Sequence, residues 1–462
     1  VLENCPTLLR PVSEPEFDRL ICRFGLFEDK PLVAVGVSGG ADSLCLLLLL
    51  DVWLRRRGGQ AVALIVDHQL RPTAQEEIQR LVGWLANYGV EHHILTWRDD
   101  KPRKKSQAAA REARYELLTG WCRRVGVLHL ALAHHRDDQA ETFMMRRTRG
   151  SGSDGLAGMP VISEQNNVRV LRPLLSLPGA RLRATLRSMH QCWIEDPSND
   201  DPAYGRTHVR RELARFSGEE QQSVHLAAAA SDYARIRRDA DEVTALLLVR
   251  VVQPDPTGFC WVDSKALEDA PTEVGLRALN QILLSISGNK YGPRRESLLL
   301  LYEAFQNNKF KRGRTLGGCY IGRGGGRCFV CREPAAARQV LCLRPGQCSI
   351  WDNRFYVILG RLGLGGQGKF EVRRLGADGW RTAKQQGSDV NEQGLPLFAR
   401  YCLPALWDLE GLVAVPHLGY LRDARCTRKR GHFDANFRPR RAVAGPPFEG
   451  VDVLVAMKRN VK

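Results

Sequence analysis

The chain has 462 residues, of which 44% are hydrophobic, so it is long enough for several domains that each bury a core. Its formal net charge of +17 favours a polyanionic partner such as nucleic acid. The longest apolar run, residues 44–50, is far shorter than the roughly 20 residues that cross a bilayer, so we expect no transmembrane helix and no membrane partner.

The first part of the chain predicts an α/β domain, which we place at residues 1–215. Its start lacks the basic and apolar segments of a secretory signal, so we expect a cytoplasmic protein. Apolar strands then alternate with crossover helices, which predicts a Rossmann-like parallel sheet with helices on both faces. The expected strands are residues 32–37, 61–66, 93–97 and 127–133, and the expected helices are residues 44–57, 74–88, 106–125 and 137–147.

Two further domains and a basic tail are expected after residue 215. Helical periodicity predicts a mostly helical domain at residues 216–338. Short β-like stretches between glycines predict a small α+β module at residues 339–424, and a basic tail rich in proline and glycine follows at residues 425–462. The 13 scattered cysteines do not predict a disulfide framework. Cys328 and Cys331 form a close pair, but residues three apart in a strand point to opposite faces, which argues against a metal site there.

A glycine-rich segment lies between the first expected strand and a helix, and it reads Ser38-Gly39-Gly40-Ala41-Asp42-Ser43. Adjacent glycines let successive N–H groups turn toward one anion, and the helix N-terminus adds positive charge. Asp42 would repel an anion unless a cation lies between them, so it predicts Mg²⁺ bound to a polyphosphate. A glycine turn with incidental serines is the structural alternative. The segment resembles the pyrophosphate-binding loop of the PP-loop ATP pyrophosphatases, which cleave ATP between its α and β phosphates.

Polar residues also follow the other expected strands, at the edge where parallel strands bind ligands. Residues 67–71 follow the second strand, and residues 134–142 follow the last one. Helical spacing places Asp138 and Glu141 on one face, with His134 near Asp138. The carboxylates can hold Mg²⁺ or a substrate ammonium group, and the histidine can transfer protons. Zinc binding and an ordinary charged helix start are the alternatives.

Two pairs of arginines lie on expected helices. Arg111 and Arg114 are three residues apart, so both can face one phosphate-rich cleft, although a solvated basic helix face fits the same spacing. Residues 193–199 predict an ordered loop, because their proline favours a turn over a strand. Arg206 and Arg210 follow this loop one helical turn apart.

In this order, the motifs closely resemble those of the tRNA(Ile)-lysidine synthetase family. The resemblance is strongest over residues 30–215, includes residues 172–175, and extends to residues 315–319, 332–333, 403–407 and 415–420. It implies an N-type ATP pyrophosphatase core that uses ATP to adenylate the wobble cytidine in the CAU anticodon of an isoleucine tRNA, with release of pyrophosphate. The ε-amine of free lysine then displaces AMP, which gives lysidine.

The resemblance also implies a role for each candidate residue. The phosphates of ATP would be held by Ser38, Gly39, Gly40, Ala41 and Ser43, with Mg²⁺ on Asp42, and the adenosine would lie near Asp67 and His68. The α-phosphate would be steadied by Arg111 and Arg114, and metal, lysine or proton transfer would be served by His134, Asp138 and Glu141. The tRNA would contact both C-terminal domains and also Arg71, Arg149, Arg206 and Arg210. A homodimer is compatible with the sequence.

Two other functions are open at this point. A tRNA thiolase on the same core would activate the base identically but deliver sulfur, which requires paired cysteines near the ATP site. The core contains Cys45, Cys122 and Cys192, none of them paired in sequence. A catalytically inactive RNA-binding protein is the second alternative, and the presence of Asp42 and Glu141 argues against it.

Overall fold

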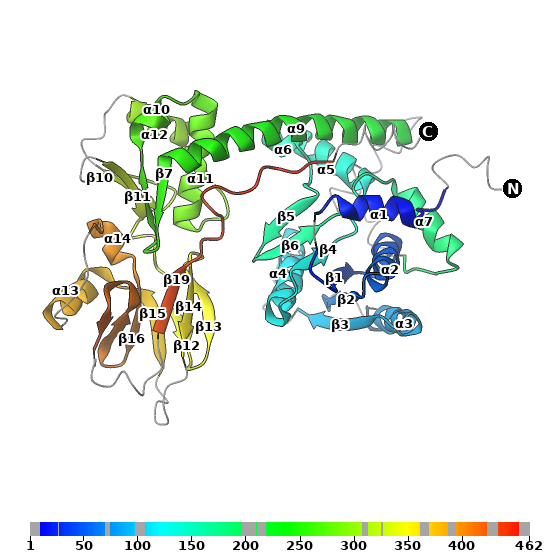
Figure 1. The fold of residues 1–462 in the computed structure, drawn as a ribbon, viewed down its shortest axis with the longest axis horizontal. Helices are drawn as coiled ribbons and strands as arrows, with labels where there is room; N and C mark the ends of the chain where they lie inside the picture. The colour runs from blue at the N-terminus through cyan, green and yellow to red at the C-terminus, as the bar shows by residue number, and fades with distance from the viewer. Residues whose placement is uncertain are drawn as a thin grey trace. The chain divides into compact units, whose positions relative to one another are not determined.

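The computed structural model forms two compact units. The first unit comprises Val1–Arg238 with Phe448–Lys462, and the second comprises Asp239–Pro447. Figure 1 shows the helices and strands of both units in chain order. The structure describes residues 10–25, 27–69, 74–97, 107–195, 209, 219–306, 313–324, 327–360, 369–386, 394–422 and 433–451.

The first unit is built on a six-stranded sheet with the strand order β3-β2-β1-β4-β6-β5. Every neighbouring pair is parallel except β5 and β6, which are antiparallel. The strands are β1 (Leu32–Val37), β2 (Gln60–Asp67), β3 (Glu91–Thr96), β4 (His129–Ala131), β5 (Ile162–Gln165) and β6 (Val168–Leu171). The predicted α/β fold with a mainly parallel sheet is therefore confirmed, and β1 has the bounds expected from the sequence.

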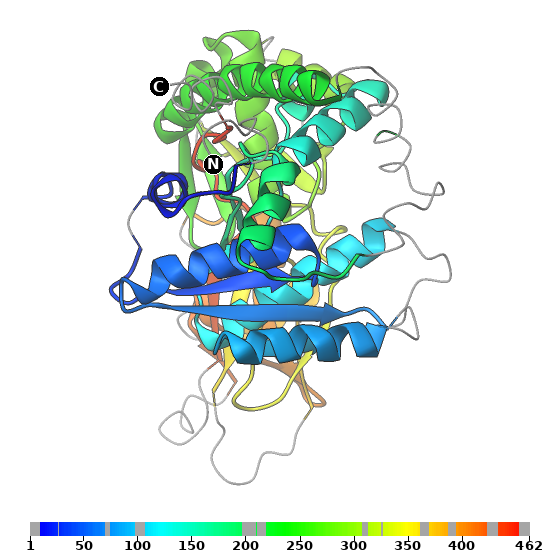
Figure 2. The ribbon, with the colours of Figure 1, turned by 90° about the vertical axis from the view of Figure 1, so that its right-hand side faces the viewer.

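Helices cover both faces of this sheet (Figure 2). Side chains alternate along a strand, so Val33 and Val35 enter one core and Ala34 enters the other. Burial on both faces explains why these strands are continuously apolar in sequence. The first core receives side chains from α1 (Glu14–Cys22), α2 (Ala41–Arg55), α3 (Ala74–Asn87) and α7 (Gly179–Ser188), and the second from α4 (Gln107–Val125).

The β5–β6 hairpin and α7 are parts of the sheet domain that the sequence analysis did not predict. Asn166 and Asn167 join the two strands with φ angles of +51° and +64°. Asparagine tolerates this left-handed conformation, and two such residues form the tight turn typical of two-residue hairpins. The Asn-Asn pair was therefore a usable signal. Between β4 and this hairpin lie α5 (Arg136–Thr148) and α6 (Ser153–Leu156).

A long helix, α9 (Glu219–Val251), begins in the first unit and ends in the second. An antiparallel sheet follows, with the order β7-β8-β11-β10-β9. Helices α10, α11 and α12 share a hydrophobic core with this sheet. The elements are β7 (Val252–Asp255), β8 (Phe259–Val262), α10 (Ser264–Glu268), α11 (Thr272–Ser287), α12 (Arg295–Gln306), β9 (Arg314–Leu316), β10 (Cys319–Gly324) and β11 (Arg327–Arg332).

The rest of the second unit holds two more sheets, of five and three strands, in the orders β12-β15-β16-β17-β18 and β13-β14-β19. Short helices accompany them, as the predicted α+β module requires. The elements are β12 (Leu341–Leu343), β13 (Cys348–Trp351), β14 (Phe355–Leu359), β15 (Phe370–Arg374), α13 (Gly376–Gln386), α14 (Leu397–Tyr401), β16 (Pro404–Asp408), β17 (Gly411–Val415), η3 (Pro416–Leu418), β18 (Tyr420–Leu421) and β19 (Phe433–Phe437).

Part of the segment expected as a basic tail has a defined place in the fold. Strand β19 pairs with β14 along its whole length. Farther along the chain, Phe448 packs against Ala157 and Ala234 in the first unit. Among the described residues, no helix is both long enough and apolar enough to cross a membrane.

Candidate active site

A tight turn joins β1 to α2, and glycine is required in it. Gly39 has a φ of +84°, and a Cβ added there would lie 2.7 Å from Cδ1 of Ile194. The backbone N–H of Ile194 donates a 2.9 Å hydrogen bond to the carbonyl of Gly39. A side chain at position 39 would therefore meet both backbone strain and a steric clash.

Two serines close this turn around the start of α2. The hydroxyl of Ser43 accepts the backbone N–H of Ser38 at 3.1 Å and donates to the carbonyl of Gly40 at 3.0 Å. The two serine hydroxyl oxygens lie 3.2 Å apart. Gly40 is the N-cap residue and has no side chain with which to cap the helix. Because the first N–H groups of a helix have no partner inside it, the turn has the chemistry of an anion site.

Asp42 lies in the first turn of α2, beside this anion site. Its Oδ2 atom is 3.5 Å from Nε2 of His135, whereas its Oδ1 atom is buried and has no hydrogen-bond partner among the described residues. A buried carboxylate oxygen needs a partner, and a cation is a suitable one. The described residues contain no group of three or more His, Cys, Asp or Glu side chains that could hold a metal. Mg²⁺ would therefore need the phosphates of ATP as further ligands.

His135 reaches Asp42 from the N-terminus of α5. Strands β1 and β4 are neighbours at the point where the strand order reverses, so the residues that follow them meet at the ligand-binding edge of the sheet. His135 caps α5: its Nδ1 accepts the N–H of Asp137 at 3.2 Å, and Asp138 accepts the N–H of His135 at 3.0 Å. Because Nδ1 is an acceptor, the proton of the neutral ring is on Nε2 and faces Asp42.

The charge of His135 depends on its carboxylate neighbours. Burial lowers the pKa of His135, but Asp138, Asp42 and Asp137 outweigh burial and raise it to about 10. A doubly protonated ring would lose the hydrogen bond from the N–H of Asp137, so the capping geometry opposes this shift. A cation on Asp42 would also reduce it. The capping geometry holds the ring with its Nε2 atom toward Asp42.

His134 has the opposite electrostatic environment. Burial lowers its pKa well below the usual 6.5, and the positive charges of Arg172, Arg114 and Arg111 lower it further, while Asp138 opposes them. His134 is therefore a neutral imidazole at neutral pH. A neutral, buried imidazole can accept a proton from a substrate group.

The arginines beside His134 also surround Tyr115. Its hydroxyl lies 3.4 Å from Nη2 of Arg111 and 3.5 Å from Nη2 of Arg172. Burial raises the pKa of Tyr115, but the positive charges of the arginines outweigh it, so the pKa is lowered. Arg172 is buried and donates to the carbonyl of Pro160 at 3.0 Å and to the hydroxyl of Ser163 at 3.1 Å. These arginines form a positively charged cluster beside His134.

Comparison with known proteins gives the family of this chain. Residues 11–216 match the family described as PP-loop domain. The chain is 35% identical to the tRNA(Ile)-lysidine synthase of Wolbachia sp. subsp. Brugia malayi, over 74% of this chain and 80% of that protein. It is 35% identical to that of Ruegeria pomeroyi, over 84% and 88% of the two chains, and 30% identical to that of Orientia tsutsugamushi, over 87% and 92%.

The chain belongs to the tRNA(Ile)-lysidine synthase family. The resemblance found in its motifs is thereby confirmed. A solved structure of a U34-tRNA thiolase from Methanococcus maripaludis is 19% identical and covers 48% of this chain and 78% of that chain, with a TM-score of 0.40. The family assignment rests on the sequence relatives.

In this tRNA(Ile)-lysidine synthase family member, several predicted site residues lie together. Asp138 and the loop of residues 38–43 meet at His135, and Glu141 is buried on the same helix as Asp138. Asp67 ends β2, where its Oδ1 accepts the N–H of Gln69 at 2.8 Å. The ring of the next candidate, His68, lies 6.0 Å from that of Trp97. Exposed Arg149 follows the last turn of α5, and Arg71, Arg206 and Arg210 lie outside the described residues.

The sequence analysis did not assign a role to His135, Asp137, Arg172, Tyr115 or Ile194. His135 and Asp137 lie in the segment that it quoted, and a capping residue followed by acidic residues was a readable signal for a helix start. Burial raises the pKa of Asp137, but His135, the N–H of Gly179 and other partners outweigh it, so the pKa is lowered. Nothing in the local sequence marks Ile194 as a neighbour of the glycine turn.

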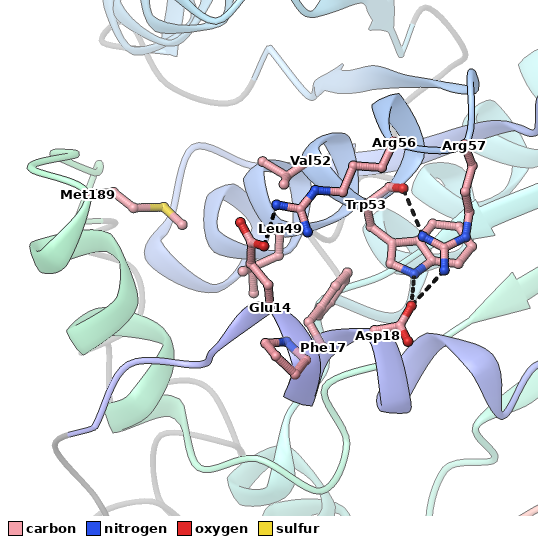
Figure 3. A pocket seen from close by; sticks show the side chains of 10 residues that line it. Glu14, Phe17, Asp18, Leu49, Val52, Trp53, Arg56, Arg57 and Met189 are labelled. Atoms are coloured by element: carbon pink, nitrogen blue, oxygen red, sulfur yellow. Dashed lines mark hydrogen bonds and ion pairs between the residues drawn. The ribbon is translucent and has the colours of Figure 1, made fainter.

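A separate cavity of about 320 Å³ lies at the other end of α2 (Figure 3). Phe17, Leu49 and Trp53 line it, and Asp18 accepts a 2.8 Å hydrogen bond from the indole N–H of Trp53. It contains none of the predicted site residues. The anion site at the start of α2 is therefore a distinct feature of the first unit.

Proposed function

We propose that this chain ligates lysine to the wobble cytidine in the CAU anticodon of isoleucine tRNA, through an adenylated cytidine, with release of pyrophosphate and AMP. We place this activity in the cytoplasm. Family membership supports the substrate, and the single observation that supports the chemistry is the buried Oδ1 atom of Asp42 beside the glycine turn. An anion site with an adjacent unsatisfied carboxylate fits a polyphosphate bridged by a divalent cation.

In the first step, the chain orients ATP for attack by the cytosine carbonyl oxygen. The N–H groups at residues 39–43 and the hydroxyls of Ser38 and Ser43 bind the β and γ phosphates, and Asp67 and His68 lie near the adenosine. Mg²⁺, when bound, neutralises charge that develops on the phosphates. Asp42 would hold this ion through Oδ1. Arg111 and Arg114 steady the α-phosphate, and Arg172 adds a third positive charge to this cluster.

In the second step, the lysine ε-amine attacks C2 of the activated cytosine. The new C–N bond forms as the C–O bond to AMP breaks, and the amine must lose a proton. Neutral His134 accepts this proton, while the carboxylates of Asp138 and Glu141 attract the ammonium form of lysine before the transfer. His134 therefore transfers the proton, and the two carboxylates of α5 bind the lysine ammonium group.

The tRNA contacts extend beyond this site. We propose that residues 216–338 and 339–424 bind tRNA as two further domains, and that Arg71, Arg149, Arg206 and Arg210 contact the substrate near the ATP site. The net charge of +17 supports binding to a polyanion. A homodimer stays compatible with this arrangement.

Sulfur transfer is the rival chemistry, and the described cysteines of the core do not support it. Burial raises the pKa of Cys45 and of Cys122 to about 12, so neither forms a thiolate readily. Cys22 and Cys192 are exposed and neither is in a disulfide, and burial raises the pKa of Cys22. A thiolase mechanism needs reactive sulfur beside the ATP site.

Product analysis tests the proposal. Isoleucine tRNA with a CAU anticodon is incubated with ATP, Mg²⁺ and labelled lysine, and its nucleosides are then separated. We expect label in a lysine-modified cytidine at the wobble position, and none in a tRNA whose wobble base is guanosine or in a reaction with Asp42→Asn. Unmodified tRNA after incubation with folded, ATP-binding protein would overturn the proposal.

A further inference from the structure

The carboxylate of Asp137 joins three helices at the edge of the site. Its Oδ1 accepts a 2.8 Å hydrogen bond from the hydroxyl of Ser223 on α9. Its Oδ2 accepts a 2.9 Å hydrogen bond from the backbone N–H of Gly179, the first residue of α7. The N-cap residue of α7, Pro178, makes no side-chain capping bond, so Asp137 supplies the cap from a neighbouring helix.

The same residue holds the imidazole that faces Asp42. The N–H of Asp137 donates to Nδ1 of His135 at 3.2 Å, and the opposite ring nitrogen lies 3.5 Å from Asp42. Gly179 packs closely on this ring, because a Cβ added to Gly179 would lie 3.2 Å from Cε1 of His135. The ring is therefore confined between the start of α7 and its own helix.

Ser223 is at the end of this chain of contacts, which runs through Asp137 and His135 to Asp42. It is 6% exposed and lies near the start of α9, within the first unit. The helix continues without interruption to Val251, beyond the point where the second unit begins at Asp239. A displacement of α9 would therefore act directly on the Ser223 hydroxyl.

We propose that Ser223 is a positioning residue that links α9, through Asp137 and His135, to the Asp42 carboxylate. The proposal rests on the proposed function, because it gives α9 a way to adjust the ATP site when the following domains bind tRNA. The link acts on geometry: a carboxylate that would hold a cation against phosphates must be positioned within a fraction of an ångström, and supporting hydrogen bonds supply this constraint.

The structural role of Asp137 can be separated from its contact with Ser223. The cap of α7 uses Oδ2 of Asp137, whereas Ser223 uses Oδ1. Removing the Ser223 hydroxyl leaves the cap, the His135 contact and the Asp137 carboxylate in place. Ser223 can therefore be tested without removing the group that ties α7 to α5.

The helix offers a matched control. Ser231 is also on α9 and is 7% exposed, but its hydroxyl donates at 3.0 Å to the carbonyl of Ala227 in the same helix. Ser231→Ala removes a buried hydroxyl of the same type with no contact to Asp137. Ser223→Thr retains a donor at the tested position.

The experiment compares Ser223→Ala, Ser223→Thr and Ser231→Ala in the full-length protein, with two readouts. The first is tRNA-dependent pyrophosphate release, and the second is calorimetric binding of α,β-methylene-ATP with Mg²⁺ in the absence of tRNA. We expect Ser223→Ala to lower kcat about tenfold with KM for tRNA within twofold, and to weaken analogue binding about threefold. Ser223→Thr and Ser231→Ala should stay within twofold of the wild type.

The inference is overturned if Ser223→Ala matches Ser231→Ala in both kcat and analogue affinity. If Ser223→Ala unfolds at a much lower temperature than Ser231→Ala, Ser223→Cys keeps the volume with a weaker donor and should give an intermediate kcat. Lysidine formation by the wild type is measured separately. Its absence would contradict the proposed function, whereas the comparison of the serine variants tests this inference. The analogue-binding readout tests the Ser223 contact even without lysidine formation.

Discussion

The Oδ2 atom of Asp42 lies 3.5 Å from the Nε2 atom of His135, although the two residues follow different strands. The contact brings the start of α2 and the start of α5 to one point at the edge of the parallel sheet. Two helix N-termini and an unsatisfied carboxylate oxygen make this point suited to a polyphosphate with its cation.

Replacing Asp42 tests this arrangement. We expect Asp42→Asn to reduce pyrophosphate release by about 10²-fold or more, because the lost charge would have held Mg²⁺ at the phosphates, while tRNA binding stays within about threefold. Asp51→Asn is the matched control, since Asp51 lies on the same helix and pairs with Arg55 at 2.7 Å, away from the site. An Asp42→Asn enzyme with half of the wild-type turnover would refute the role of Asp42.

Gly39→Ala tests the glycine turn. The substitution combines a left-handed φ with a 2.7 Å approach to Cδ1 of Ile194, and we expect a loss of about 1–3 kcal/mol in stability and a KM for ATP raised by about tenfold or more. Adding Ile194→Val removes the clashing methyl group and should recover part of the ATP affinity. Gly126→Ala has the same φ of +84° with no atom within 4 Å, so it should be strained without affecting the KM for ATP.

The sequence predicted the sheet well where strands were long and apolar. The run that became β1 is buried on both faces, and this leaves a continuous apolar signal. Strand β5 is only partly buried and mostly polar, and β6 contains an arginine, so this hairpin lacks the continuous apolar run that marks the other strands. The place of β19 depends on pairing with β14, which no local pattern reveals.

The candidate site was predictable only in part. The rule that ligands bind at the carboxyl ends of parallel strands placed the segments that hold Asp42, His134 and Asp138 at one edge of the sheet, and Asp42 and Asp138 both lie beside His135. It could not say which of the two adjacent histidines faces Asp42, because that depends on the capping geometry at His135. Arg172 reaches the site from a segment distant in sequence, through tertiary structure alone.

The pH dependence of lysine transfer tests the role of His134. Burial and the nearby arginines disfavour its protonated form, so the pKa lies below 6.5 and the neutral base persists as the pH falls through 6.5. We expect the acid limb of the rate of lysidine formation to lie below pH 6.5, and His134→Ala to lower the rate about 10²–10⁴-fold. If the rate instead fell with a midpoint at or above pH 6.5, and this midpoint shifted in His134→Ala, the lowered pKa of His134 would be contradicted.

The stability of the second unit depends on a buried ion-pair group. Asp352 accepts from Arg332 at 3.0 Å and from Arg354 at 2.8 Å, and all three side chains are buried. Asp352→Asn leaves two buried cations without their carboxylate, and we expect a loss of about 3–5 kcal/mol in the free energy of unfolding. Asp408→Asn removes the partly exposed ion pair with Arg422 and should lower the free energy of unfolding by less than about 1 kcal/mol. A denaturant titration of each variant measures both losses. Equal losses in the two variants would contradict this account.

The order of activation is the most direct test of the central claim, since an enzyme that activates lysine itself would use the same three substrates. In the proposed mechanism the cytosine carbonyl attacks the α-phosphate, and the lysine amine acts only after the cytidine has been adenylated. The measurement is pyrophosphate release from ATP with either tRNA or lysine omitted. We predict release that requires CAU isoleucine tRNA and proceeds without lysine. Lysine-dependent exchange of pyrophosphate into ATP without tRNA would contradict the account.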